Sequence, residues 1–215
     1  MRAADNLPLF SERHGNSKID TLYHESMARK DGYRRIAGVD EAGRGPLAGP
    51  VVAAAVILPE GLVLEGVRDS KEMTERAREK AFSLITRRAT ALGIGVVSQR
   101  RIDESNILKA SLEAMKIAVL SLYPAPEYFL VDGRHKVPVS IPQKCLKKGD
   151  RLSLSVSAAS VVAKVYRDRI MRAYHDMYPV YGFSENKGYG TWKHRAAIRK
   201  HGCFPLHRLT FKGVS

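Results

Sequence analysis

Two acidic residues stand side by side at Asp40 and Glu41, between an apolar run and a glycine-rich turn. The segment 36–46 reads IAGVDEAGRGP. Adjacent carboxylates repel each other, and a bound cation relieves that repulsion. Mg²⁺ takes oxygen ligands and is held in proteins by one or two carboxylates together with water. The pair therefore predicts metal-assisted chemistry.

Two further acidic residues follow segments that predict strands. Asp132 comes at the end of the run 128–131, and Asp150 comes just after the run 139–146. Taken alone, Asp132 before a glycine is typical of a turn, and Asp150 is typical of a helix cap. Four acids at the ends of rigid elements are also suited to holding two metal ions, which clamp the attacking and leaving oxygens of a phosphodiester.

The charge of the chain indicates a polyanionic partner. The 215 residues carry a formal net charge of +14, with 36 Lys and Arg against 22 Asp and Glu. Most of this surplus falls between residues 144 and 215, which also hold more than half of the aromatic side chains. Basic groups release counterions from phosphates, and aromatic rings stack on bases and sugars. A generally basic surface and core aromatics remain the alternative reading.

The elements that must position these residues follow from hydrophobic periodicity. Residues 1–34 are polar and predict a weakly structured extension with at most a short helix at about 19–29, and 35–215 predict a single α/β domain. Its helical, basic last third begins near residue 152. Lys164, Arg167, Arg169 and Arg172 lie off the apolar stripe there, so we expect them to face solvent or ligand. Strands are predicted at 35–40, 51–58, 93–98, 128–131 and, more weakly, 139–146, and the continuously apolar run 51–58 predicts a buried strand. Helices are predicted at 74–89, with Thr74 as the cap, and at 104–122, 152–174 and 192–201.

Several motifs resemble those of the ribonuclease HII family, the type 2 ribonucleases H. The first and longest is GVDEAGRGPLAGPVV at 38–52. The others are DSK at 69–71, VDG at 131–133, KGD at 148–150, SAASVVAKVYRD at 157–168, NKGYGT at 186–191 and HRLTF at 207–211. They occur in order over residues 36–214. The resemblance implies a ribonuclease H-like mixed sheet flanked by helices.

The resemblance also implies site residues. The four acids of the family fall on Asp40, Glu41, Asp132 and Asp150, as catalytic residues and ligands of two Mg²⁺ or Mn²⁺ ions. Its ribose-reading loop falls on Gly43, Arg44 and Gly45, and its junction-sensing tyrosine falls on Tyr189. Lys71 and Lys164 lie in matching motifs and are expected to contact the substrate.

The residue types in the loop agree with this role. Glycine lacks a Cβ atom, so the backbone at Gly43 and Gly45 can approach nucleic acid closely. Arg44 can hold a phosphate bidentately. The 2′-hydroxyl is both donor and acceptor, and it distinguishes RNA from DNA. Tyr189 could stack on a deoxyribose, or it could be a half-buried packing residue. His207 and Arg208 are expected to dock the C-terminal tail or touch phosphate.

The function implied is an endoribonuclease that cuts the RNA strand of RNA–DNA hybrids and ribonucleotides embedded in duplex DNA. The expected products carry a 5′-phosphate and a 3′-hydroxyl. Two alternatives stay open: a DNA nuclease with the same fold, and a non-enzymatic basic protein that binds nucleic acid. We expect a monomer.

The N-terminal segment carries one apolar motif, NLPLF at residues 6–10. It resembles the peptide by which bacterial replication proteins dock on the sliding clamp, with Asn6 in place of the usual glutamine. The alternative is that these side chains fold back on the protein itself. No secretory signal or membrane-spanning run is visible, which predicts a cytoplasmic protein, and Cys145 and Cys203 are expected to be idle thiols.

Overall fold

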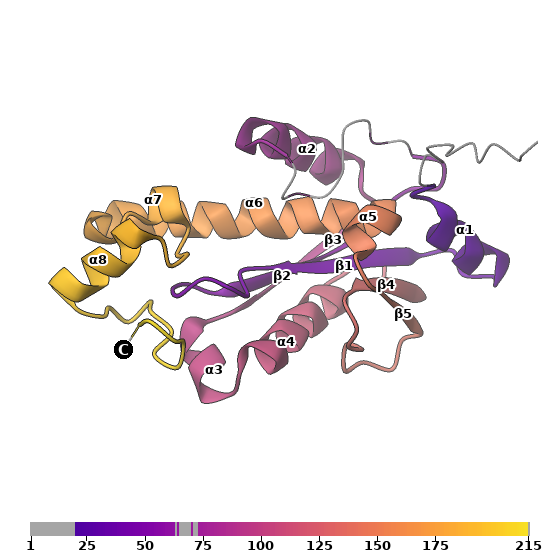
Figure 1. Ribbon diagram of the computed structural model, residues 1–215. Coiled ribbons are helices and arrows are strands. Elements are labelled where there is room, and N and C mark those ends of the chain that lie inside the picture. The colour runs from indigo at the N-terminus through magenta and orange to yellow at the C-terminus, as the bar shows by residue number, and fades with distance from the viewer. Residues whose placement is uncertain (1–19, 63, 65–69, 71–72, 215) are drawn as a thin grey trace, which may run out of the picture.

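The computed structural model describes residues 20–62, 64, 70 and 73–214 (Figure 1). The described residues form one five-stranded sheet in the order β3-β2-β1-β4-β5. β1 pairs antiparallel with β2 and parallel with β4, so the sheet is mixed, as expected. The strands are β1 (Ile36–Ala42), β2 (Val51–Ile57), β3 (Ala91–Val97), β4 (Tyr128–Asp132) and β5 (Gln143–Leu146).

Helices cover both faces of the sheet (Figure 1). α6 lies along one face with α2 outside it, and α4 lies on the other face. The helices are α1 (Tyr23–Lys30), α2 (Glu75–Arg88), α3 (Gln99–Glu104), α4 (Ile107–Leu120), α5 (Gly149–Leu152), α6 (Leu154–Met177), the short 3₁₀ helix η1 (Pro179–Tyr181), α7 (Phe183–Asn186) and α8 (Trp192–His201).

The interior strand β2 explains why the sequence shows an unbroken apolar run at residues 51–58. All seven of its residues are buried. Val51, Ala53 and Ala55 pack on the α4 side, whereas Ala54 and Val56 pack on the α6 side. Successive side chains of a strand point to opposite faces, so a strand covered on both faces reads as continuously hydrophobic.

α6 approaches β1 more closely than a side chain would allow. A Cβ atom added at Gly38 would lie 2.0 Å from the backbone carbonyl carbon of Ser155. Gly38 therefore lets the first turn of α6 rest directly on the strand. This contact lies two residues before Asp40, and it fixes the distance between the acidic end of β1 and α6.

Several predicted elements have different boundaries. The helix predicted over 104–122 is two helices, because Ser105 and Asn106 leave helical geometry and the side chain of Asn106 caps the start of α4 by accepting from Lys109 N. The helix predicted over 152–174 begins at Leu154, capped by Ser153, and continues to Met177. Thr74 caps α2, as predicted.

The predicted N-terminal extension is partly folded. Residues 23–30 form α1, in which Glu25 and Ala28 are buried. One carboxylate oxygen of Glu25 accepts from the hydroxyls of Ser153 and Ser155 at 2.6 and 2.8 Å, which ties α1 to the start of α6. Residues 1–19 lie outside the described part of the chain.

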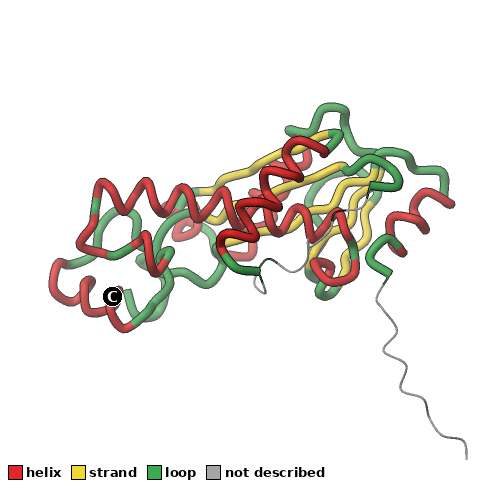
Figure 2. Tube along the Cα trace, turned by 90° about the horizontal axis from the view of Figure 1, so that it is seen from above, coloured by secondary structure: helices red, strands yellow, loops and turns green. Residues whose placement is uncertain are grey.

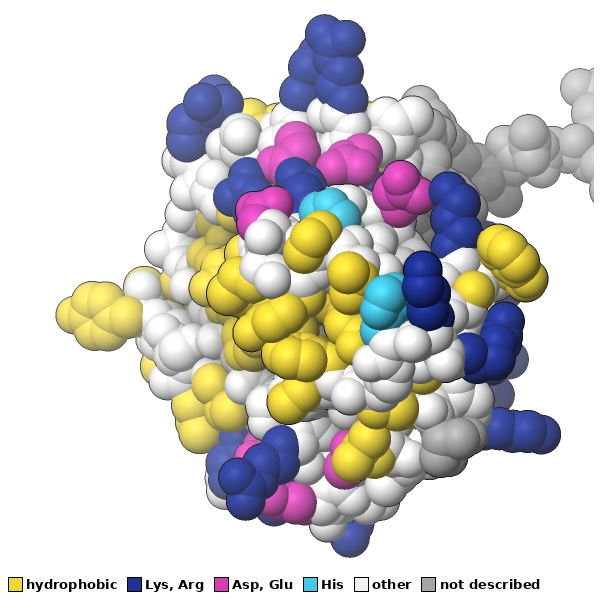
Figure 3. Space-filling view, turned by 90° about the vertical axis from the view of Figure 1, so that its left-hand side faces the viewer, with side chains coloured by type: hydrophobic (Ala, Val, Ile, Leu, Met, Phe, Trp, Pro, Cys, Tyr) yellow, Lys and Arg dark blue, Asp and Glu magenta, His cyan; other side chains and the backbone are white. Residues whose placement is uncertain are grey.

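The chain that follows α6, with α7, α8 and the tail, forms the end of the molecule beyond the sheet (Figures 1 and 2). Seen from that end, apolar side chains gather in a patch (Figure 3). Met177, Val180 and Trp192 are large apolar residues at this end of the molecule that are exposed. The two cysteines are free, as expected, and no helix of the described residues is long and apolar enough to cross a membrane.

Candidate active site

The acidic pair lies where β1 runs beside a second acidic strand end. β1 and β4 are parallel, with Val39 opposite Val131, so the following residues, Asp40 and Asp132, are neighbours at the same end of the sheet. Asp40 is buried. Val39 belongs to the core on the α4 side of the sheet. Successive side chains of a strand point to opposite faces, so Asp40 faces α6 and Glu41 faces α4. Three of the four predicted acids thus share one end of the sheet.

The surroundings of Asp40 oppose its ionisation. Burial raises the pKa of this carboxyl well above its usual range, and the nearby charges of Glu41 and Asp132 raise it further. Hydrogen bonds from Ser160 and from the amide of Glu41 act in the opposite direction. The hydroxyl oxygens of Ser160 and Ser70 are 2.9 Å apart. Because Ser160 donates to Asp40, Ser70 donates to Ser160, and the serine of the DSK motif thereby joins the acidic site.

Glu41 is held by one neighbour and left incomplete at its other oxygen. Its Oε1 accepts from Arg44 Nη1 at 3.1 Å. Burial raises the pKa of Glu41, Arg44 opposes that increase, and Asp132 adds to it. The second oxygen, Oε2, is buried and has no hydrogen-bond partner among the described residues. A buried carboxylate oxygen without a donor, beside two other carboxylates, is chemistry that suits a divalent cation.

Asp150 reaches the same region from α5. The amide of Gly149 donates to Oδ1 of Asp132 at 2.7 Å, so the first turn of α5 lies against the end of β4. Asp150 follows directly and is buried. Within the described part of the chain, no group of three acidic, histidine or cysteine side chains already stands at metal-binding distances.

Two buried guanidinium groups hold the loop that follows Glu41. Arg208 donates to the carbonyl of Gly43 at 2.6 Å, to that of Arg44 at 3.0 Å and twice to that of Gly49, at 3.0 and 2.9 Å. Arg167 donates to the carbonyls of Pro50, Ala48 and Lys187 at 3.0, 3.1 and 3.0 Å. Burial lowers the pKa of Arg208 to about 9.

The tail reaches this loop through backbone pairing. Arg208 N donates to Leu47 O, and Gly49 N donates to Leu206 O, both at 2.8 Å. Sequence reasoning missed the inward role of Arg208 and Arg167. The alternative it offered for Arg208, docking of the tail, is the geometry observed.

Tyr189 lies against the same loop. Leu47 N donates to Gly188 O at 2.8 Å, which joins the loop of residues 186–191 to the loop of residues 43–49. A Cβ atom added at Gly45 would lie 3.6 Å from the Tyr189 ring, so the two predicted substrate readers are in contact distance. The Tyr189 side chain remains about half exposed, at 44%. Arg44, Gly45 and Tyr189 are exposed and form one surface, and the buried Gly43 lies next to it in the chain.

Of the four basic residues of α6 that were predicted to face solvent or ligand, Arg169 is exposed, and Lys164 and Arg172 are partly exposed. Arg167 is buried rather than facing solvent or ligand. Lys164 is bonded to Asp168 at 2.7 Å, Arg169 to Glu79 at 2.6 Å and Arg172 to Glu75 at 2.6 Å. Helical periodicity identified one buried stripe, but α2 and the loop of residues 48–50 cover further parts of this helix. Lys71 lies outside the described residues.

A mixed sheet covered by helices on both faces, with acidic residues ending two adjacent parallel strands, defines a protein of the ribonuclease H fold. The family model of ribonuclease HII matches residues 37–214. A ribonuclease HII of Geotalea uraniireducens is 56% identical over 193 residues, which are 90% of this chain and 89% of that protein. The chain belongs to the ribonuclease HII family.

Solved structures agree with this assignment. The ribonuclease H2 of Pyrococcus horikoshii superimposes with a TM-score of 0.72 at 28% identity, over 84% of this chain and 95% of that one. The ribonuclease HII in a complex with PCNA from Archaeoglobus fulgidus shares the fold, with a TM-score of 0.70 at 24% identity over 83% and 96% of the two chains. The protein is an endoribonuclease acting on RNA–DNA hybrids, and its family depends on divalent metal.

Proposed function

We propose that Asp40, Glu41, Asp132 and Asp150 are the catalytic and metal-binding residues of this endoribonuclease. The observation that carries the proposal is the arrangement of Asp40 and Asp132 at adjacent ends of parallel strands, with the buried, unpartnered oxygen of Glu41 beside them. We assign Asp40 and Asp132 as shared ligands. Glu41 would hold the metal nearer the ribose, and Asp150 would position the other.

Two Mg²⁺ or Mn²⁺ ions bound here would supply an activated water nucleophile and would stabilise charge on the departing 3′-oxygen, leaving a 5′-phosphate. The chain contributes the orientation of the carboxylates. Ser160 bonds Asp40, and the Gly149 amide bonds Asp132, so each carboxylate keeps one oxygen fixed by the protein. Lys164, one helical turn beyond Ser160, and Lys71 are proposed to contact the phosphate backbone of the substrate.

We propose that the loop of residues 43–45 recognises the ribose and that Tyr189 stacks on the sugar of the adjoining deoxynucleotide. The contact between Gly45 and the Tyr189 ring supports a single surface that reads both sides of an RNA–DNA junction. Arg44 is half exposed and bonded to Glu41. It is therefore close enough to the acids to exchange that contact for a substrate phosphate.

A comparison of three duplexes tests this function: a continuous RNA–DNA hybrid, DNA with a single embedded ribonucleotide, and plain DNA. We expect Mg²⁺-dependent cleavage of the first two, none of the third, and none of any in excess chelator. Tyr189→Ala should reduce kcat/KM on the single ribonucleotide by about tenfold and change the continuous hybrid much less, because only the former presents a deoxyribose to the ring.

Three results would count against the proposal. Cleavage of plain DNA favours a DNA nuclease, and binding without cleavage favours a basic binding protein. Equal losses on both ribonucleotide substrates for Tyr189→Ala would make that residue a packing residue only.

We also propose that residues 6–10 dock on a sliding clamp, which would raise the local concentration of the enzyme at newly made DNA. The motif at residues 6–10 carries this proposal. The ribonuclease HII of Archaeoglobus fulgidus, which shares the fold, forms a complex with PCNA and supports it. We expect the full chain to be retained by immobilised bacterial clamp, and a chain lacking residues 1–10 to be lost while it cleaves a short duplex at the unchanged rate. Equal retention of both chains would contradict the assignment.

A further inference from the structure

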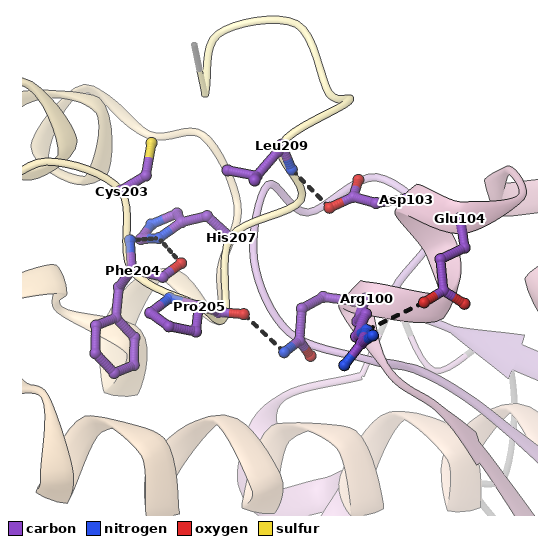
Figure 4. Close-up of a pocket in the computed structure, with 9 residues that line it drawn as sticks. Arg100, Asp103, Glu104, Cys203, Phe204, Pro205, His207 and Leu209 are labelled. Atoms are coloured by element: carbon purple, nitrogen blue, oxygen red, sulfur yellow. Dashed lines mark hydrogen bonds and ion pairs between the residues drawn. The ribbon is translucent and has the colours of Figure 1, made fainter.

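Two buried histidines meet behind the surface that carries Tyr189. His194 comes from α8 and His207 from the C-terminal tail, and their exposed fractions are 0% and 2%. Their Nε2 atoms are 3.1 Å apart. Beyond that contact, His194 Nδ1 is 2.9 Å from the carbonyl oxygen of Tyr189. His207 Nδ1 is 2.9 Å from the amide nitrogen of Phe204 and 3.1 Å from its carbonyl oxygen (Figure 4).

The partners at the two ends determine where each proton lies. The carbonyl of Tyr189 can only accept, so Nδ1 of His194 carries a hydrogen and its Nε2 is the acceptor. His207 must then donate from Nε2, which leaves its Nδ1 to accept from the amide of Phe204. This one assignment satisfies the contacts with the Tyr189 carbonyl, between the two Nε2 atoms and with the Phe204 amide. They form a continuous chain that runs from Phe204 N–H through both rings to Tyr189 O. The carbonyl oxygen of Phe204 then receives no hydrogen from His207 Nδ1.

The surroundings keep both rings neutral. Burial lowers the pKa of both His194 and His207 below the usual histidine value. Phe183 meets His194 edge-on with ring centroids 5.4 Å apart, and Tyr181 meets His207 edge-on at 4.9 Å. A second proton on His194 would place two donors against each other at the Nε2 contact, and a second proton on His207 would place its Nδ1–H against the amide of Phe204.

We propose that His194 and His207 are positioning residues for substrate selection, which fix the backbone of Tyr189 so that its ring lies against Gly45. The inference rests on the junction-reading role proposed for Tyr189. It adds that the preference for a junction depends on a pair of residues that touch no substrate. The amide of Thr191 donates to the same Tyr189 carbonyl at 2.8 Å, so that oxygen accepts two hydrogen bonds and its orientation is set from two sides.

The first test measures the protons directly and needs no activity. Nitrogen-15 NMR of the histidine rings in the full chain distinguishes Nδ1–H from Nε2–H tautomers. We expect His194 to carry its hydrogen on Nδ1 and His207 on Nε2, both neutral at pH 7. The reverse assignment for either ring, or a charged ring, overturns the proposal.

The second test uses two substitutions of similar size at one position. In His194→Asn, the side-chain amide nitrogen occupies the place of Nδ1 and can still donate to Tyr189 O. In His194→Gln, the amide lies at the place of Nε2 and cannot. We expect His194→Asn to keep the ratio of kcat/KM on the single ribonucleotide to that on the continuous hybrid within about twofold of wild type. His194→Gln should lower that ratio by about tenfold.

Melting temperatures and Tyr189→Ala separate the possible failures. Loss of cleavage on both substrates in parallel with a lower melting temperature would indicate a purely structural pair and overturn the proposal. The same ratio for His194→Asn and His194→Gln would also overturn it. If Tyr189→Ala leaves the ratio unchanged, the junction-reading role itself fails. If Tyr189→Ala lowers the ratio but His194→Gln does not, only the positioning role fails.

Discussion

Asp40→Asn and Asp132→Asn are each expected to reduce cleavage of an RNA–DNA hybrid by more than about a hundredfold, with folding intact. The substitution keeps the size of the side chain and removes the negative charge that a divalent cation requires. Both residues lie at the shared end of β1 and β4, so neither loss can be compensated by the other. The measurement is the single-turnover rate at saturating Mg²⁺.

Asp40→Asn is expected to have a second, opposite effect, on stability. The raised pKa of Asp40 means that the folded state binds its proton more tightly than the unfolded state does. Stability of the wild type without metal therefore falls as pH rises from the unfolded pKa to the folded one, and the deficit persists above it. Asp40→Asn removes this cost, so at neutral pH in chelator the variant should melt at a higher temperature than the wild type.

A matched control is available in Asp31→Asn, which makes the same chemical change at an exposed residue after α1. We expect wild-type turnover and no gain in melting temperature for this variant. Full activity in Asp40→Asn or Asp132→Asn would refute the metal-site assignment. Inactivity together with a lower melting temperature would mean that the carboxylates support the fold.

The sequence predicts the structural position of a residue when the partners of that residue lie close to it in the chain. The Thr74 cap and the two-sided burial of β2 depend on near neighbours, and both followed from the pattern of residues. The position of Asp40 and Asp132 at one end of the sheet followed from their places at the ends of predicted strands. The ribonuclease HII family assignment, which came from the motifs, is confirmed by the comparisons.

The residues that sequence reasoning misplaced have distant partners. Arg167 lies off the apolar stripe of α6, yet it is buried and donates hydrogen bonds to the carbonyls of residues 48, 50 and 187. Ser160 bonds Ser70, which lies 90 positions away in the chain. No periodicity in the sequence contains these contacts. A buried arginine that binds only carbonyls cannot be distinguished by its spacing from an arginine exposed to solvent.

The glycine at position 43 illustrates the same limit. Its predicted role was to let the backbone approach nucleic acid. The structure adds an internal reason, because Gly43 has a φ of +100° and a Cβ atom there would lie 2.1 Å from Nε of Arg167. Any larger residue must displace a guanidinium that holds three carbonyls in place. The loop's shape is therefore fixed from inside the protein.

Gly43→Ala is accordingly expected to lower kcat/KM by at least about tenfold on both the continuous hybrid and the single ribonucleotide. It should also lower the melting temperature, because alanine at this φ costs about 1 kcal/mol and the displaced Arg167 adds to that cost. Gly32→Ala is the matched control. Gly32 has a φ of +95° and no atom within 4 Å of the added Cβ, so it imposes the same backbone strain without the collision.

The pair separates backbone strain from loop geometry. Gly32→Ala should lose about 1 kcal/mol of unfolding free energy and keep wild-type cleavage of both substrates. If Gly43→Ala cleaves as fast as the wild type, the loop held by Arg167 and Arg208 does not set the substrate site. If Gly32→Ala loses as much activity as Gly43→Ala, the loss reflects general instability. Cleavage rates measured well below both melting temperatures decide between these outcomes.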